Sequence, residues 1–268
     1  MDLLHALLLL LGGCCAGFLA GFFGVGGGLV LVPILLLYYQ SVHLTSLVST
    51  HMALATSLLI VVFASVSSAF QYQRNGNVVW KAVLWMGVTS VIGGLLGAVI
   101  AAGLEARTLR QIFAGVVLIS AIRMLVETRK PKIDTMPPVQ APPLLGTGFL
   151  VGILSALAGV GGGVLSIPVM HSFLKFPLKK ALGTSSATIV ITALAAALGY
   201  VIRGWSNPLV PTGGTLGYVD WLTALPLIAG SIPMAAFGAH VANTTKVTRL
   251  KQIFAIFLLV IGMKLLLF

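Results

Sequence analysis

The chain reads GVGGGLVLVP at residues 24–33 and GVGGGVLSIP at residues 159–168. The two stretches begin with the same five residues, end in proline, and lie 135 positions apart inside apolar sequence. Glycine admits left-handed backbone and proline lacks an N–H donor, so both interrupt helices. The repeat therefore predicts a duplicated chain whose helices are interrupted at matching places, which we call the first glycine run (24–28) and the second glycine run (159–163).

The composition predicts an integral membrane protein. Hydrophobic residues make up 58% of the 268 residues, charged residues make up 8%, and the mean hydropathy is +1.08. A soluble domain carries about 25% charged residues, so this chain cannot cover a water-exposed surface. The net charge of +11 is explained by Lys and Arg at cytoplasmic membrane edges. The sequence has no basic run with interleaved aromatic residues, so we do not expect it to bind nucleic acid.

Ten apolar segments divide the chain into two halves of five. They are residues 3–22, 29–39, 44–70, 79–103 and 109–126, followed by 144–157, 164–174, 181–202, 219–242 and 250–268. The proline-rich stretch between them predicts an N-terminal repeat (1–127), a cytoplasmic linker (128–143) and a C-terminal repeat (144–268). After a six-residue insertion in the second half, LRQIFA at 109–114 aligns with LKQIFA at 250–255.

Segment lengths leave two readings of each glycine run. A membrane span needs about 20 apolar residues, whereas 29–39 and 164–174 hold 11 residues each and 144–157 holds 14. Each glycine run therefore either tips a re-entrant helical hairpin or interrupts one broken helix.

The distribution of positive charge favours one topology. We expect an all-α polytopic membrane protein made of two five-segment inverted repeats, each with a broken or re-entrant helix pair. This arrangement places 12 of the 16 Lys and Arg in the cytoplasm. The alternative, two parallel four-crossing repeats with eight crossings in all, places eight on each side. Positive charge gathers on the cytoplasmic side, so both termini are expected outside and the linker inside.

The glycine runs are the first candidate substrate-binding site. Helices that start inside the membrane point unpaired N–H groups and positive dipole ends at an anion. Close packing of small residues between helices is the alternative explanation. The candidate residues are Gly24, Val25, Gly26, Gly27 and Gly28, with Gly159, Val160, Gly161, Gly162 and Gly163.

Two hydroxyl clusters are the second part of the candidate site. Ser49, Thr50 and His51 align with Thr184, Ser185 and Ser186 at the same offset of 135. Hydroxyls donate to an oxyanion and are less costly to bury than a charge. The alternative is that they bond to carbonyls of their own helix. The histidine, which has no histidine counterpart, either donates to an anion, carries a proton or simply packs.

The acidic residues argue against a cation pathway. All five Asp and Glu lie at segment ends or in loops, whereas proton and cation pathways commonly use carboxylates inside the membrane. No paired carboxylates, metal-spaced His/Cys cluster or Ser-His-Asp set can be assembled in the apolar segments. We therefore expect no enzyme activity, no metal and no cofactor.

These motifs resemble those of the TauE/SafE family of sulfite and organosulfonate exporters. The resemblance rests on the twin glycine–proline motifs, the duplicated halves and the Thr184-Ser185 pair. It implies a multi-pass permease of the plasma membrane, which in bacteria is the inner membrane. The first half departs from the pattern by carrying His51 in its hydroxyl cluster.

The resemblance also implies a function. Its substrates would be sulfite, thiosulfate or organosulfonates, and the usual direction is export. We expect a secondary transporter that alternates access around a midplane anion site. Import of the same anions, an anion channel and a non-transporting partner subunit are the alternatives. The expected partners are the substrate and the lipid bilayer, without nucleic acid, and a homo-oligomer remains open.

Overall fold

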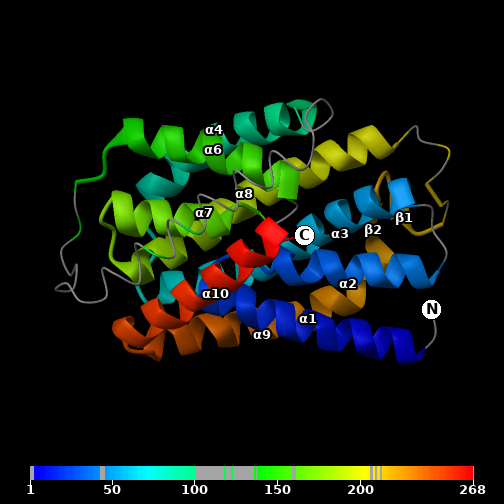
Figure 1. The fold of residues 1–268 in the computed structure, drawn as a ribbon, viewed down its shortest axis with the longest axis horizontal. Helices are drawn as coiled ribbons and strands as arrows, with labels where there is room; N and C mark the ends of the chain where they lie inside the picture. The colour runs from blue at the N-terminus through cyan, green and yellow to red at the C-terminus, as the bar shows by residue number, and fades with distance from the viewer. Residues whose placement is uncertain are drawn as a thin grey trace.

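A computed structural model gives the architecture of the chain (Figure 1). It describes residues 3–42, 46–100, 138–158, 161–205 and 213–267, together with residues 118, 122, 136, 208, 210 and 211. The predicted segment 109–126 lies outside the described residues apart from two positions.

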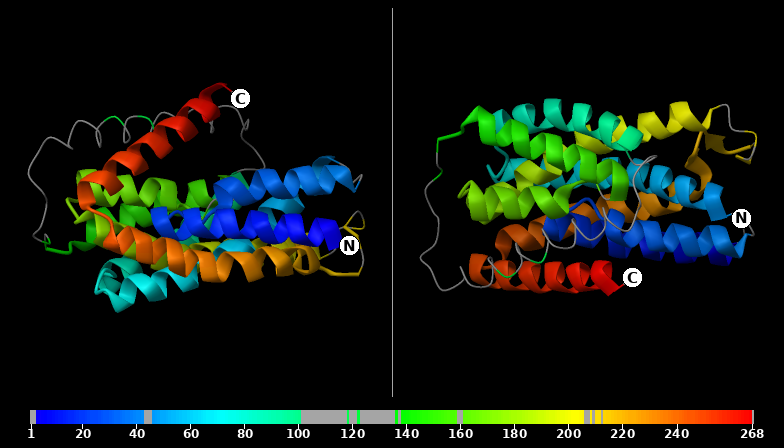
Figure 2. Two further views of the ribbon diagram at one scale, coloured as in Figure 1. Left: turned by 90° about the horizontal axis from the view of Figure 1, so that it is seen from below. Right: turned by 45° about the horizontal axis from the view of Figure 1, so that its top comes forward.

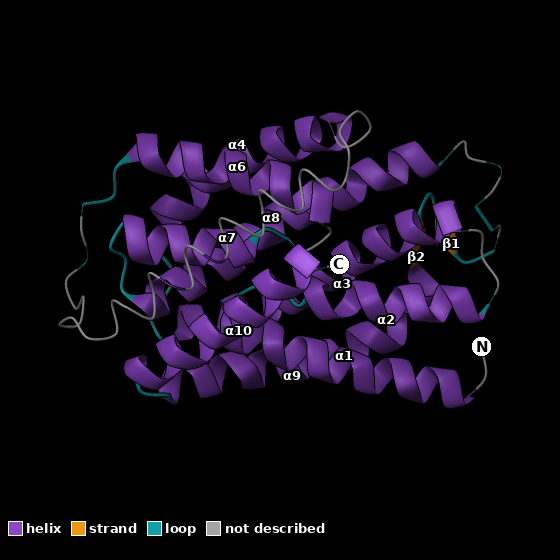
Figure 3. Cartoon of the chain, in the orientation of Figure 1, coloured by secondary structure: helices purple, strands orange, loops and turns teal. Residues whose placement is uncertain are grey.

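The described chain is almost entirely helical (Figure 3). The helices are α1 (Leu3–Phe23), α2 (Gly28–Ser41), α3 (Ser46–Arg74), α4 (Trp80–Ile100), α6 (Ala141–Ala158), α7 (Gly163–Pro168), the π-helix η2 (Val169–Phe173), α8 (Leu178–Gly204), α9 (Trp221–Thr244) and α10 (Val247–Leu267). Strands β1 (Thr215–Leu216) and β2 (Val219–Asp220) pair antiparallel before α9. Five of the described helices are long and apolar enough to cross a membrane, as expected of a polytopic membrane protein.

The predicted segments match these helices to within four residues at each end. Two differences have a local cause. Helix α6 begins at Ala141, inside the predicted linker, because Pro142 and Pro143 fit the first turn of a helix. The predicted segment 164–174 changes from α-helix to π-helix after Pro168, whose missing N–H and bulky ring disturb the regular ladder.

Each glycine run turns the chain back on itself. In the first half, a Cβ on Gly27 would lie 2.7 Å from the Ala16 carbonyl oxygen, and the rings of His5 and Tyr38 lie 6.0 Å apart. The end of α1 thus contacts the start of α2, and the start of α1 contacts its end. Contacts of Gly162 with Val151 and Ser155 make α6 and α7 a second hairpin. The hairpin reading of the glycine runs is therefore the one that the helices adopt.

Glycine faces hold α1 against α9. Gly13, Gly17 and Gly21 of α1 lie against the backbone of α9 at Leu227, Ser231 and Ala235. The separation of 214 positions is the same in all three contacts, so the two helices run parallel (Figure 1). Small residues allow such close approach of membrane helices.

The same packing recurs in the other half of the bundle. Gly93 and Gly97 of α4 lie against Phe149 and Ile153 of α6, and these helices also run parallel. The first helix of each half therefore packs on the fourth helix of the other half.

Helices α3 and α8 cross at the centre of the bundle and run in opposite directions. Tyr72, near the end of α3, contacts Gly183 near the start of α8, while His51 lies beside Tyr200 at the other ends. Helix α3 runs parallel to α9, since Ser67 and Gln71 bond to Ile232 and His240 in the same order. Figure 2 shows α10 lying obliquely across one face of this bundle.

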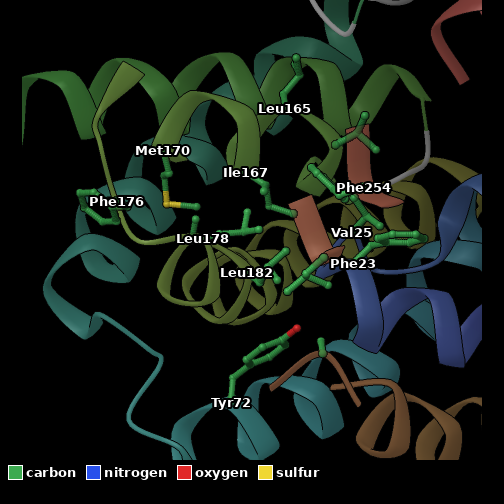
Figure 4. Close-up of a cluster of buried hydrophobic side chains, with 14 of the residues drawn as sticks. Phe23, Val25, Tyr72, Leu165, Ile167, Met170, Phe176, Leu178, Leu182 and Phe254 are labelled. Carbon is green, nitrogen blue, oxygen red and sulfur yellow. The ribbon is translucent and has the colours of Figure 1, made fainter. Parts of the chain in front are cut away.

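A large core cluster of the described residues includes the end of α1 and Val25 of the first glycine run (Figure 4). Phe23 and Val25 lie against Ile167 of α7 and Phe254 of α10, and the two phenylalanine rings are 5.5 Å apart. The hydroxyl of Tyr72 donates to the Gly21 carbonyl at 3.0 Å. Apolar packing thus fixes the end of α1 inside the protein.

Candidate anion-binding site

The two glycine runs have the same backbone conformation. Gly27 and Gly162 are the N-caps of α2 and α7, and both have φ 79° and ψ −4°. Gly26 and Gly161, just before them, have φ 82° and 76°. Left-handed backbone costs a residue with a Cβ about 1–2 kcal/mol. These four positions therefore require glycine for the turn itself.

Both runs leave a helix N-terminus inside the protein without a side-chain cap. Neither N-cap glycine makes a side-chain hydrogen bond, and residues 20–28 and 161–168 are buried. The first N–H groups of a helix lack acceptors within that helix, and its dipole makes this end positive. An anion with several acceptor oxygens satisfies both.

The two glycine runs contact each other. A Cβ on Gly163 would lie 2.5 Å from the Val25 Cα and 2.8 Å from the Gly24 carbonyl oxygen. Only glycine allows the two backbones to come this close. The other two residues of the second run, Gly159 and Val160, lie outside the described residues.

The same two side chains border both runs. A Cβ on Gly26 would lie 2.9 Å from Val61 of α3 and 3.2 Å from Ile189 of α8. A Cβ on Gly161 would lie 2.9 Å from Ile189 and 3.1 Å from Val61. The runs therefore meet where α3 and α8 cross, at the place where corresponding elements of the two halves come together.

Ser185 links α8 to the first glycine run. Its hydroxyl donates to the Gly24 carbonyl at 2.9 Å, and its Oγ lies 2.7 Å from Oγ of Ser166 on α7. Both serines are buried. Ser186, the next residue, is also buried, and its Oγ has no partner among the described residues. The structure thus brings Ser185 of this predicted hydroxyl cluster to the first glycine run.

Hydrogen bonds at the starts of α4 and α9 identify the first-half counterpart of Thr184. Thr184 accepts the N–H of Val79, the residue before α4, at 3.1 Å. Thr56 on α3 accepts the N–H of Asp220, the residue before α9, at 3.0 Å. Because α4 and α9 hold the same place in the two halves, Thr56 corresponds to Thr184. The predicted equivalence of Ser49 with Thr184 is therefore wrong.

The pair Thr56-Ser57 is thus the hydroxyl pair that sequence reasoning missed. Both residues are fully buried. They precede Thr184-Ser185 by 128 positions, seven fewer than the spacing of the glycine runs, so the first half holds seven extra residues before the pair. The repeated Thr-Ser dipeptide could have indicated this correspondence. The same dipeptide also occurs at Thr45-Ser46 and Thr89-Ser90, so it does not identify the pair by itself.

Residues 9–265 match the family model described as sulfite exporter TauE/SafE. The chain belongs to the TauE/SafE family. It is 32% identical over 256 residues to a probable membrane transporter protein of Haemophilus influenzae, with 96% of each chain covered. It is 26% identical over 270 residues to the probable membrane transporter protein YunE of Bacillus subtilis, with 94% of each covered. No solved structure matches it.

TauE/SafE membership confirms the resemblance found in the motifs. The relatives are probable membrane transporters, and a similar protein of Methanocaldococcus jannaschii, 27% identical over 225 residues, covers 84% of this chain and 83% of its own. With five candidate spans in the described helices, the chain is a multi-pass protein of the plasma membrane, the inner membrane in bacteria.

Ser49, Thr50 and His51 of this TauE/SafE protein lie away from the glycine runs. They sit near the start of α3, ten to twelve residues before Val61, which is about 15–18 Å along a helix. Ser49 is buried and Thr50 is exposed. The His51 ring stacks on Tyr218 with centroids 5.2 Å apart. The structure therefore does not join these three residues to the other candidates.

Asp220 gives the TauE/SafE bundle a carboxylate at the start of α9. It accepts hydrogen bonds from the N–H and hydroxyl of Thr223, at 3.0 and 2.6 Å, as the N-cap. The Tyr39 hydroxyl of α2 lies 3.3 Å from the carboxylate and 3.2 Å from Thr56 Oγ1. The corresponding residue before α4 is Val79, so this charge occurs in one half only.

Proposed function

We propose that the protein is a secondary transporter, not an enzyme, that exports small sulfur-containing anions such as sulfite, thiosulfate or organosulfonates. The observation that carries the proposal is the meeting of two buried helix N-termini at the glycine runs, both without side-chain caps. Such ends recruit anions without a buried cation. The family description as a sulfite exporter supports the substrate class.

Helix directions support an arrangement of inverted repeats. Helix α3 opposes α8, its counterpart in the second half. Helix α1 is parallel to α9, and α4 is parallel to α6 (Figure 1). The first helices of the two halves are therefore antiparallel to each other, and so are the fourth helices. The two hairpins therefore enter the bundle from opposite ends. Inverted repeats with discontinuous helices at a shared site are a common transporter design.

The distribution of charge supports an orientation. In the described chain, basic residues gather where α3 and α9 end and where α4, α8 and α10 begin. They are Arg74, Lys81, Lys175, Lys179, Lys180, Lys246, Arg249 and Lys251. By the positive-inside rule this end is cytoplasmic. Helix α6 starts at the same end and α1 at the other, so the linker is inside and the N-terminus outside.

The packing of the helices indicates which two groups of helices move against each other during transport. Among the described helices, α9 packs closely on α1 and α3, with α2 against α1 and α3, while α4 packs closely on α6 and α8, with α7 against both. The two groups meet along α3 and α8, beside the glycine runs. Rocking of one group against the other would open the anion site to each side in turn. Each group contains one helix from the opposite half of the sequence.

The membrane potential favours export over uptake of an anion. An inside-negative potential favours anion exit by about 2.3 kcal/mol per charge per 100 mV. A divalent anion such as sulfite receives twice that driving force. Export then needs no coupled ion, whereas uptake of the same anion would require one.

Flux measurements test the function directly. In proteoliposomes loaded with sulfite or methanesulfonate, efflux should rise when an inside-negative potential is imposed, without a sodium or proton gradient. Protein-free liposomes and acetate loading are the controls. Flux that needs an ion gradient and runs inward would establish the importer instead. Single-channel currents in planar bilayers would establish a channel, and absence of flux for every anion would refute transport.

Cysteine labelling tests the topology. In a background of Cys14→Ser and Cys15→Ser, we introduce Gln140→Cys in the linker and Leu216→Cys in β1, both at exposed positions. A membrane-impermeant maleimide should label the Leu216→Cys protein in intact cells and the Gln140→Cys protein only after lysis. The reverse pattern would overturn the assigned orientation, and labelling of both in intact cells would overturn the inverted arrangement.

A further inference from the structure

Ser65 on α3 directs its hydroxyl at the first glycine run. The residue is 1% exposed, and a Cβ built on Gly26 would lie 3.5 Å from Ser65 Oγ. This Oγ has no hydrogen-bond partner within the described part of the chain. Buried polar groups in proteins are nearly always paired, and an unpaired one calls for a bound partner or another explanation.

The hydroxyl faces a second set of unused donors. Helix α2 is 14 residues long, and its N-cap Gly27 supplies no side-chain acceptor. The Val30 N–H of the first turn donates to the Gly27 carbonyl at 3.0 Å, so the N–H groups of Gly28 and Leu29 are the ones that lack acceptors within the helix. Ser65 Oγ lies beside Gly26, two residues before the first of these N–H groups, and a ligand rich in acceptor oxygens fits donors from both elements.

We infer that Ser65 is a substrate ligand, which donates to the oxyanion head group held at the N-terminus of α2. The inference rests on the proposed function and adds a residue and a specificity to it. Apolar side chains of Val61 and Ile189 line the rest of Gly26. Donors arriving from separate directions suit the three spread oxygens of a sulfonate or sulfite better than the two coplanar oxygens of a carboxylate.

The second half offers no matching hydroxyl. At the 128-position offset that relates Thr56 to Thr184, the residue corresponding to Ser65 is Ala193. The two halves therefore differ at this position, although Ser155, beside Gly162, is also a buried serine without a hydrogen-bond partner among the described residues. The Ser65 hydroxyl serves the part of the head group that lies against the first glycine run.

Substitution of Ser65 tests the inference, with Ser68 as the matched control. Ser68 is also 1% exposed on α3, but its hydroxyl donates to the Ser65 carbonyl at 3.2 Å. Apparent Kd values for sulfite and methanesulfonate are taken from thermal stabilisation of the purified full chain. Ser65→Ala should raise both Kd values about tenfold, the loss of one hydrogen bond to a charged group. Ser68→Ala should leave them within about twofold of wild type.

Each result separates this inference from the proposed function. If wild type binds both anions and Ser65→Ala binds them equally well, the role of Ser65 is refuted while transport stands. If neither anion stabilises wild type, the proposed function fails and this inference with it. Should Ser65→Ala not yield folded protein, Ser65→Cys fills the same space with a poor donor. It should raise both Kd values in the same way, and unchanged values would again refute the role.

Discussion

Leucine at Gly27 or at Gly162 is expected to abolish transport. Both residues have φ 79°, where a side chain costs about 1–2 kcal/mol. A Cβ at Gly27 would lie 2.7 Å from the Ala16 carbonyl oxygen, and one at Gly162 would lie 2.4 Å from Cγ1 of Val151. Such overpacking costs a further 1–3 kcal/mol, approximately. Sulfite efflux from proteoliposomes should fall to the level of protein-free liposomes.

The same substitution at Gly199 is the control. Gly199 lies within α8, and a Cβ there would meet nothing within 4 Å. Gly199→Leu should keep wild-type flux and a melting temperature at or above that of wild type, since leucine is a better helix former than glycine. If Gly27→Leu and Gly162→Leu proteins transport at the wild-type rate, the glycine runs are not the site.

Valine at Thr56 or at Thr184 is expected to lower the free energy of unfolding by about 1–3 kcal/mol each. Each hydroxyl accepts the N–H of the residue just before a long helix, Asp220 before α9 in one case and Val79 before α4 in the other. Valine has nearly the shape of threonine but accepts no hydrogen bond, so a buried donor loses its partner. Chemical denaturation in detergent should show a loss at each position, and the larger one at Thr56, because its Oγ1 also lies 3.2 Å from the Tyr39 hydroxyl.

Thr50→Val distinguishes the two assignments of the hydroxyl pair. Thr50 is exposed near the start of α3, and surface substitutions usually change stability by less than about 0.5 kcal/mol. A loss at Thr50 as large as that at Thr184, with none at Thr56, would contradict the assignment of Thr56 as the counterpart of Thr184.

The sequence was sufficient for most of the helices because their boundaries follow from single stretches of chain. Each glycine run interrupts an apolar segment with residues that no regular helix prefers, so helices α1, α2, α6 and α7 could be located before their packing was known. The choice between hairpins and broken spans depended on contacts between elements, such as Gly27 with Ala16, which local sequence does not specify.

Sequence reasoning missed the hydroxyl pair Thr56-Ser57 and Ser65 for a different reason. Thr56 can be aligned with Thr184 only if the length of the connection between glycine run and hydroxyl pair is known in each half. A comparison of the two halves without gaps applies the spacing of the glycine runs to the next helix, where it no longer holds. Ser65 shows no pattern of its own, since buried serines on α3 are common. Only the direction of its hydroxyl toward Gly26 sets it apart, and that direction depends on how two distant helices dock.

The parallel packing of α1 on α9 also governs how the protein is made. The glycine face of α1 is synthesised among the first 25 residues, but the residues that cover it follow 214 positions later. Until α9 is inserted, this groove faces lipid or the insertion machinery. Long sequence separation between contacting residues slows folding. A nascent chain halted before Trp221 therefore carries an open helix-binding groove, and α1 acquires its contacts with α9 only after most of the bundle has been synthesised.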